Sequence, residues 1–249
     1  MTPALAVRGA TKRFGAVLAL DGVDLEVEHG EVVAVLGDNG AGKSTLIKCI
    51  SGVHRLDAGE IELDGDAATI SSPAAARAHG IETVYQDLAL FDNLGPSANF
   101  YAGREDAGPG WMPRPLRLMR RRSMADATTE TLERLQVTLP DRNAVVGLMS
   151  GGQRQVIAVA RAAAFASKVV ILDEPTAALG VRESRRVLDL ILRLRGEGRA
   201  VIVISHAMDH VTEVADRAVV MRRGQKVGEE IPSPDSQERI VALIVGTSA

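Results

Sequence analysis

The sequence has little of two features that would each indicate a particular class of protein: cysteine and net charge. Its single cysteine, Cys49, cannot form an internal disulfide, which is consistent with a reducing cytosol. The formal net charge is −3 over 249 residues, and acidic and basic residues are mixed along the chain. Because non-specific nucleic-acid binding is driven by an excess of positive charge, nucleic acid is not expected as the main partner.

Long apolar runs are also missing. No uncharged apolar segment approaches the roughly 20 residues that a membrane span needs, and residues 1–14 lack the basic stretch and apolar run of a secretory signal. At 249 residues the chain reaches the upper end of a single compact domain and is long enough to bury a sizeable core. We therefore expect one domain that is soluble or reaches a membrane only through a partner.

Two apolar patterns predict two kinds of strand. Over residues 23–28, Val23, Leu25 and Val27 alternate with acidic residues, which is typical of a half-exposed strand, so antiparallel β structure is expected near the start. By contrast, continuous Val- and Ile-rich runs predict strands buried on both faces of a parallel sheet; they occur at 31–37, 168–174 and 200–206. The sequence therefore predicts a mixed α/β protein.

The region from about 92 to 165 has a different character. The β-branched runs disappear and helix-period segments follow a cluster of Pro and Gly at 108–115, which predicts a helical lobe inserted into the α/β core. The arginines at 114, 117 and 120–122 are expected to form a solvated face of this lobe, and contact with lipid headgroups or nucleic acid is the alternative. Residues 236–246 predict a short amphipathic helix at the C-terminal end.

A phosphate-binding loop is the clearest motif. Gly37, Gly42, Lys43 and Ser44 have the G-x-x-x-x-G-K-[ST] spacing, between a buried strand and a helix. Such a loop turns its N–H groups toward phosphate, and the helix start adds about half a unit of positive charge. Lys43 is expected to reach the β- and γ-phosphates and Ser44 to hold Mg²⁺. The predicted nucleotide-binding residues are Gly37, Asp38, Asn39, Gly40, Ala41, Gly42, Lys43, Ser44 and Thr45.

Two adjacent carboxylates, Asp173 and Glu174, end the second buried strand. On its own, such a pair is usually a helix cap or a solvated turn. Beside a phosphate-binding loop a catalytic role is favoured, because ATP hydrolysis needs a carboxylate that supports the metal and a group that orients water. We expect Asp173 to act on Mg²⁺, through water, and Glu174 to polarise the attacking water.

Residues 149–153 contain a second helix start. Ser150 and Gln153 have the spacing of a capping box, and Val156, Ile157, Val159 and Ala160 supply a buried stripe behind it. A structural cap is one interpretation. It does not explain Gly151 and Gly152, two glycines at the point where the backbone is expected to be most exposed.

With these motifs the chain resembles the ATPase subunits of ABC transporters over nearly its whole length. Residues 37–45 look like Walker A, 168–175 like Walker B, and 149–153 like the LSGGQ signature, with Met149 in place of the usual Leu. The resemblance implies an α/β, P-loop NTPase (RecA-like) core with an N-terminal antiparallel β part and an inserted α-helical lobe. It implies one domain over 1–249, with the core and β lobe at 1–91 and 166–249 and the helical lobe at 92–165.

The resemblance also implies roles for three further residues. Gln86 matches the Q-loop glutamine, a catalytic residue and metal ligand; His206 matches the switch histidine, which holds water and γ-phosphate in line; Phe14 matches the aromatic that stacks on adenine. Other interpretations stay open: Phe14 as a core residue and His206 as a polar strand end. A zinc site at His206 and His210 lacks a visible third ligand.

For the second helix start, the resemblance implies that two ATPase domains pair head to tail. Ser150, Gly151, Gly152 and Gln153 of one chain would then complete the ATP site that contains Lys43 of the other. The D-loop of the family usually has Asp where this chain has Gly180, so no catalytic role is assigned there.

Residues 83–90 and 173–184 look like the ATPases of bacterial monosaccharide importers of the ribose, xylose and fructose class. This resemblance implies an ATP-hydrolysing importer subunit that uses ATP and Mg²⁺ and works by dimer closure. Its partners would be a second copy, transmembrane permease subunits and, indirectly, a periplasmic or extracellular sugar-binding protein. It would be peripheral on the cytoplasmic face of the cell membrane.

Two rival functions have less support in the sequence. One is a soluble ABC-type ATPase that acts on nucleic acid or ribosomes; such proteins usually have long coiled coils or paired ATPase domains, and neither is apparent here. The other is a P-loop GTPase, for which the expected Asn-Lys-x-Asp motif is missing.

Overall fold

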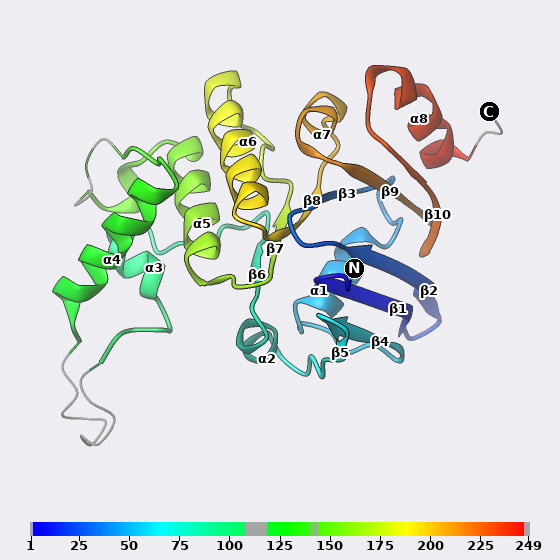
Figure 1. Ribbon diagram of the computed structural model, residues 1–249, viewed down its shortest axis with the longest axis horizontal. Coiled ribbons are helices and arrows are strands. Elements are labelled where there is room, and N and C mark those ends of the chain that lie inside the picture. The colour runs from blue at the N-terminus through cyan, green and yellow to red at the C-terminus, as the bar shows by residue number, and fades with distance from the viewer. Residues whose placement is uncertain (1, 108–118, 140, 142–143, 247–249) are drawn as a thin grey trace.

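The computed structural model describes residues 2–107, 119–139, 141 and 144–246. Two β-sheets form its centre (Figure 1). The first is antiparallel with the order β2-β1-β4-β5, and its strands are β1 Leu5–Phe14, β2 Val17–Val27, β4 Ala58–Leu63 and β5 Asp66–Ala67. The second has the order β10-β9-β3-β8-β7-β6, and its strands are β3 Val32–Leu36, β6 Ile81–Val84, β7 Val169–Asp173, β8 Ala200–Ile204, β9 Arg217–Arg222 and β10 Gln225–Glu230.

The second sheet is parallel except for β10, which pairs antiparallel with β9 at the edge. Its central strands β3 and β8 are buried along their whole length, and β7 is buried up to its last residue, Asp173. In β2, Val23, Leu25 and Val27 are buried and Asp24 is exposed. The predicted antiparallel start, the predicted parallel core and the mixed α/β class are therefore confirmed.

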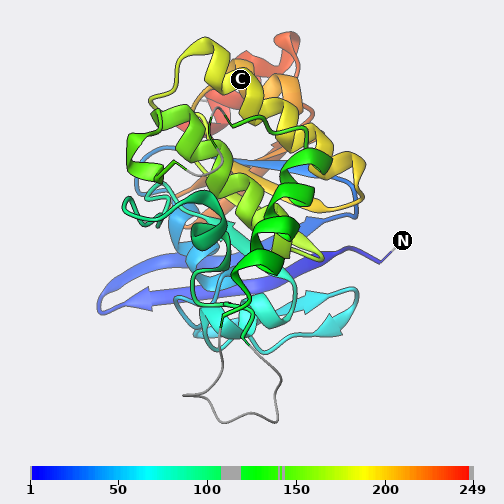
Figure 2. The ribbon, with the colours of Figure 1, turned by 90° about the vertical axis from the view of Figure 1, so that its left-hand side faces the viewer.

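Eight helices accompany the sheets in the described part of the chain: α1 Lys43–Ile50, α2 Pro73–Ala78, α3 Pro96–Tyr101, α4 Arg121–Arg134, α5 Gly151–Phe165, α6 Val181–Gly196, α7 Met208–Val214 and α8 Gln237–Val245. Short 3-10 turns lie at Val146–Leu148 and Pro234–Ser236. Helices α3, α4 and α5 gather at one end of the molecule, and Figure 2 views them from that side. This grouping agrees with a helical lobe, and α8 confirms the predicted C-terminal helix.

The arginine-rich segment is only partly described. Arg114 and Arg117 lie outside the described residues. Arg120 is exposed and directly precedes α4, which begins at Arg121.

Both faces of the parallel sheet are covered. On one face α1, through Leu46 and Ile47, packs in a cluster with the first sheet and Ile171 of β7. On the other face α5 and α6, through Ile157 and Ile191, share a cluster with neighbouring strand residues such as Leu172. Successive strand residues point to opposite faces, which explains why these strands are apolar without alternation.

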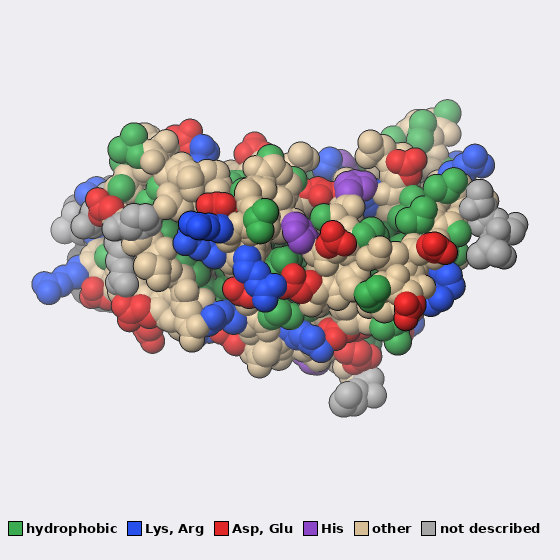
Figure 3. Space-filling view, turned by 90° about the horizontal axis from the view of Figure 1, so that it is seen from above, with side chains coloured by type: hydrophobic (Ala, Val, Ile, Leu, Met, Phe, Trp, Pro, Cys, Tyr) green, Lys and Arg blue, Asp and Glu red, His purple; other side chains and the backbone are tan. Residues whose placement is uncertain are grey.

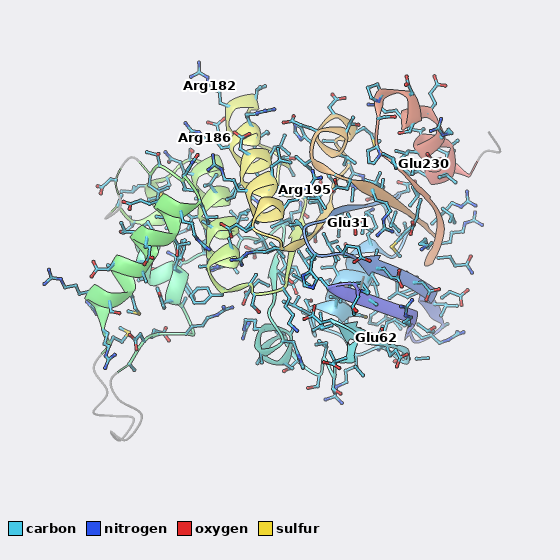
Figure 4. All side chains as sticks on the ribbon, viewed as in Figure 1. Glu31, Glu62, Arg182, Arg186, Arg195 and Glu230 are labelled. Atoms are coloured by element: carbon cyan, nitrogen blue, oxygen red, sulfur yellow. The ribbon has the colours of Figure 1, made fainter. Side chains whose placement is uncertain are left out.

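Charged residues form hydrogen bonds and ion pairs at the edge of the second sheet where its parallel strands begin. Asp216, just before β9, accepts the Val32 N–H at 2.9 Å and pairs with Arg195 of α6 at 2.5 Å. Arg217 donates to Glu31 at 2.9 Å, and Figure 4 labels Glu31 and Arg195 in this region. The opposite edge, where the parallel strands end, carries a different set of polar residues.

Candidate functional site

Five neighbouring parallel strands, β9, β3, β8, β7 and β6, end at the edge of the second sheet opposite to Asp216 and Arg217. Because β3, β8, β7 and β6 are adjacent and parallel, the residues that follow them meet at one place, as ligands do in open α/β sheets. Here lie the loop after β3, His206 after β8, Asp173 and Glu174 at the end of β7, and Gln86 after β6. These residues line one cavity of about 510 Å³, together with residues 17–19, 39–45, Ile204 and Arg223.

The loop after β3 requires glycine at two positions. Gly37 has φ +148° and Gly42 has φ +103°. A Cβ at Gly37 would lie 2.3 Å from the Met221 carbonyl oxygen, and one at Gly42 would lie 2.8 Å from the Ala19 carbonyl oxygen. Gly42 precedes α1 and provides no side-chain cap, so the N–H groups at the helix start remain available to an anion.

Lys43 is buried, with 6% of its surface exposed. Its Nζ donates to the carbonyl oxygens of Gly37 at 2.7 Å and Asp38 at 3.1 Å, so the ammonium group lies over the loop. Burial lowers the pKa of Lys43, against the opposing effect of Glu174, Asp38 and Asp173. An anion in the cavity would compensate for the lost hydration of this buried charge.

Glu174 combines three unusual features. Its backbone is left-handed, with φ +52°, and its N–H donates to the Ile204 carbonyl at 2.9 Å. Its Oε1 lies 3.2 Å from His206 Nε2, but the geometry is not that of a hydrogen bond, and this buried oxygen has no hydrogen-bond partner. Burial raises the pKa values of both Glu174 and Asp173. A strained, poorly partnered carboxylate in a cavity is typical of a catalytic group.

The predicted metal ligands Ser44, Gln86 and Asp173 line the same cavity. Among the described residues there is no group of three or more His, Cys, Asp and Glu side chains that could hold a metal ion. The one carboxylate and the neutral oxygen donors fit Mg²⁺, which protein sites usually bind through one or two carboxylates plus phosphate oxygens. His210 has a structural contact instead: its Nδ1 is in a hydrogen bond with Thr176 Oγ1 at 3.0 Å.

Phe14 is a surface residue. It is 44% exposed at the end of β1, so it does not belong to the core. Its ring packs edge-on against the ring of His54, with the two ring centroids 5.1 Å apart, and Lys12 Nζ lies 5.5 Å from the centroid of the Phe14 ring. It is not among the residues that line the cavity, whereas Val17, three residues further on, is. Adenine stacking on Phe14 stays a prediction.

The capping box at the start of α5 is present in both directions. The Gln153 N–H donates to Ser150 Oγ at 3.3 Å, and the Ser150 N–H donates to Gln153 Oε1 at 2.9 Å. Residues 150–153 do not line the cavity described above. Leu148, two residues before Ser150, is 82% exposed. Within one chain, the structure therefore does not bring the two predicted anion sites together.

The two glycines of this helix start differ. Gly151 is exposed, and a Cβ there would meet nothing within 4 Å. Gly152 is buried, and a Cβ there would lie 2.1 Å from Glu183 Cγ and 2.5 Å from Glu183 Cβ on α6. The expectation that both glycines are exposed is wrong for Gly152, because close packing of α5 on α6 fills the space. Gly180 also lies next to this side chain: a Cβ there would be 2.8 Å from Glu183 Oε2.

Two arginines of α5 form hydrogen bonds with the segment after Gln86. The sequence did not indicate either of them. Arg161 donates to the carbonyl oxygens of Leu88 and Ala89, both at 2.9 Å. Arg154 donates to Asp92 at 2.7 Å. Arginines seven residues apart share a helix face, but no sequence signal indicated their acceptors.

A glycine-rich phosphate loop, a buried lysine and a carboxylate pair at the carboxyl edge of a parallel sheet define a P-loop nucleotide-hydrolysing domain. Comparison with known proteins assigns this domain to one family of P-loop proteins. The ABC transporter family model matches residues 20–177, which is more than half of the chain, so the protein belongs to the ABC transporter family as its ATPase component.

Two relatives match along nearly their whole length. The chain is 49% identical to the fructose import ATP-binding protein of Rhizobium meliloti and 43% identical to the xylose/arabinose import ATP-binding protein of Sulfolobus acidocaldarius; in each case the match covers 98% of this chain and 94% of the relative. Identity to a ribose import ATP-binding protein of Rubrobacter xylanophilus is 42% over 100% of this chain but 48% of that protein, so the chain spans about half of its length.

Solved structures agree with the fold. A nucleotide-free ATP-binding cassette from an ABC transporter superposes with a TM-score of 0.83 at 25% identity, covering 97% of this chain and 98% of that one. A dimeric bacterial ABC transporter cassette superposes with a TM-score of 0.74 at 24% identity, covering 92% and 99%.

Proposed function

We propose that the protein is the ATP-hydrolysing subunit of an ABC importer for a monosaccharide. The observation that carries this proposal is the cavity in which the phosphate loop, Asp173, Glu174, Gln86 and His206 meet. The sugar is proposed from the relatives, since the fructose and xylose/arabinose import proteins match nearly end to end.

In the proposed site the N–H groups of residues 37–45 and the Lys43 ammonium bind the β- and γ-phosphates. Glu174 orients and polarises the attacking water, and His206, 3.2 Å from Glu174, keeps that water in line with the γ-phosphate. Ser44, Gln86 and, through water, Asp173 would hold Mg²⁺, which would supply positive charge against the phosphate oxygens. Phe14 provides the stacking surface for adenine.

A second copy completes the site. Ser150, Gly151, Gly152 and Gln153 present a helix start away from their own cavity, which supports a head-to-tail pair in which they bind the γ-phosphate held by the partner's Lys43. The exposed side chains of Leu148 and Val181, 82% and 89% exposed, flank this region and would be covered in such a pair.

Transport itself belongs to other chains in this proposal. No helix in the described ranges is long and apolar enough to cross a bilayer. The protein would lie on the cytoplasmic face of the membrane against permease subunits, which in turn receive sugar from a binding protein. The lobe at 92–165 would move against the core at 1–91 and 166–249 as ATP is enclosed, with Gln86 at the junction.

Nucleic acid gains no support as an alternative partner. On the face shown in Figure 3, Lys and Arg side chains are interspersed with Asp and Glu rather than gathered into one basic patch. Stable binding to DNA or RNA at physiological salt would contradict this part of the proposal.

The shared ATP site is tested with a variant that accumulates in the ATP-bound state. Glu174→Gln should bind ATP but hydrolyse it slowly, and should accumulate as an ATP-bound dimer in light scattering. Adding Gly151→Asp should abolish the dimer, because a carboxylate would face the partner's γ-phosphate, whereas adding Gly151→Ala should not, since a Cβ fits there. Dimers in the Gly151→Asp double variant would contradict the head-to-tail arrangement.

The import role is tested in proteoliposomes that contain the cognate permease, with radiolabelled fructose, xylose and ribose. ATP-dependent uptake of a monosaccharide that is lost with Glu174→Gln is the expected result. An active ATPase that copurifies with no permease and supports no uptake would contradict the import role.

A further inference from the structure

The turn between β9 and β10 contains an unexpected residue. Arg223 and Gly224 are the two turn residues between the paired Arg222 and Gln225, and both are left-handed, with φ +51° and +83°. Such a two-residue turn favours Asn, Asp or Gly at its first position, because other side chains crowd the backbone there. The conformation of the turn therefore gives no reason for an arginine at position 223.

Hydrogen bonds connect this turn to the phosphate loop and to β2. The Gly224 N–H donates to the Ala41 carbonyl at 2.9 Å, and the Asp21 N–H donates to the Gly224 carbonyl at 2.8 Å. Gln225 Nε2 adds a bond of 2.7 Å to Asp21 Oδ2. These bonds hold the turn between β2 and the loop, so the position of Arg223 relative to the nucleotide cavity is defined by backbone structure.

Arg223 is one of the residues that line the nucleotide cavity. Among the residues that line the cavity, Lys43 and Arg223 are the two with permanently cationic side chains. Lys43 already donates to two loop carbonyls. Arg223 is exposed and takes part in none of the hydrogen bonds and ion pairs found in the described structure, so its guanidinium group is available to a ligand.

We propose that Arg223 is a nucleotide-binding residue whose guanidinium group binds the polyphosphate of the nucleotide held by the phosphate loop. Guanidinium groups form strong, charge-assisted hydrogen bonds with phosphate oxygens. The proposal rests on nucleotide binding at this site and adds to it a second cation, which comes from a turn far from the loop in sequence.

The test compares Arg223→Asn with wild type by calorimetric titration of MgATP, MgADP and adenosine, at concentrations where the chain is monomeric. Asn suits the turn, so the variant should fold. Affinity for MgATP and MgADP should fall about fivefold to tenfold, as expected for the loss of one exposed charged contact, and less at high salt; adenosine affinity should not change. Arg223→Lys should retain most of the affinity.

The matched control is Arg77→Asn, which removes the same charge from an exposed site on α2 outside the cavity and should bind like wild type. MgATP affinity of Arg223→Asn within twofold of wild type would overturn the proposal, even if dimer turnover were slower, because Arg223 would then act on the second chain. An equal loss for adenosine would also overturn it. Failure of wild type to bind MgATP would instead contradict nucleotide binding at this site.

Discussion

Replacing Gly152 by alanine tests how closely the start of α5 packs on α6. The new Cβ would lie 2.1 Å from Glu183 Cγ and 2.5 Å from Glu183 Cβ. Carbon atoms in contact are normally about 3.5–4.0 Å apart, so the helices must separate by about 1–1.5 Å or the Glu183 side chain must be displaced together with its backbone. Since the nearest atoms are close to the α6 backbone, a rotamer change alone cannot relieve the contact.

Overpacking of this kind costs about 1–3 kcal/mol. Alanine recovers about 0.5–1 kcal/mol through its higher helix propensity, which leaves a net loss of roughly 1 kcal/mol at the middle of both ranges and at most about 2.5 kcal/mol. For a chain of this size the melting temperature should fall by about 2–4 °C for each kcal/mol. Urea unfolding followed by circular dichroism measures the change in the free energy of unfolding directly.

Gly151→Ala is the matched control, because a Cβ there meets nothing within 4 Å, and it should be neutral or slightly stabilising. Combining Gly152→Ala with Glu183→Ala removes the contact to Cγ but not the one to Cβ, so the double variant should recover part of the loss, by about 0.5 kcal/mol or more. If Gly152→Ala proved as stable as Gly151→Ala, the packing argument for Gly152 would be refuted.

Three further predictions follow from the site. Asp173→Asn should raise the melting temperature of the nucleotide-free protein at pH 7 but weaken Mg²⁺-dependent ATP binding. Because burial raises the pKa of Asp173, its ionised form opposes folding above the unfolded-state pKa of about 3.9. The gain in stability should therefore vanish when calorimetric scans are taken below that pH. Ser150→Ala should lower the unfolding free energy by about 1 kcal/mol in urea titrations, while Ser150→Thr should lose much less, because the hydroxyl accepts the Gln153 N–H. Arg161→Leu should destabilise by about 2 kcal/mol or more and increase hydrogen exchange at residues 88–92, because it leaves the carbonyls of Leu88 and Ala89 without their donor; unchanged exchange there would show that other contacts hold the segment.

Much of this fold could be predicted because its signals are local. The runs that became β3, β7 and β8 are apolar on both sides, and the structure buries them on both sides. The capping box at Ser150 needs only a spacing of three residues, and the loop at 37–45 needs only glycines before a helix. The order of these motifs also identified the ABC family, which the family match and the near full-length relatives confirm.

The sequence by itself determined which elements form and which chemical groups follow them. Only the tertiary structure decided their neighbours. Because β8 lies between β3 and β7, His206 comes close to Glu174. Glu183 fills the space beside Gly152, and Arg223 lines the phosphate cavity from the turn after β9. Local spacing specifies helices, turns and caps through contacts within a few residues. Pairings across tens or hundreds of residues depend instead on how whole elements pack together, and no short pattern in the sequence records them.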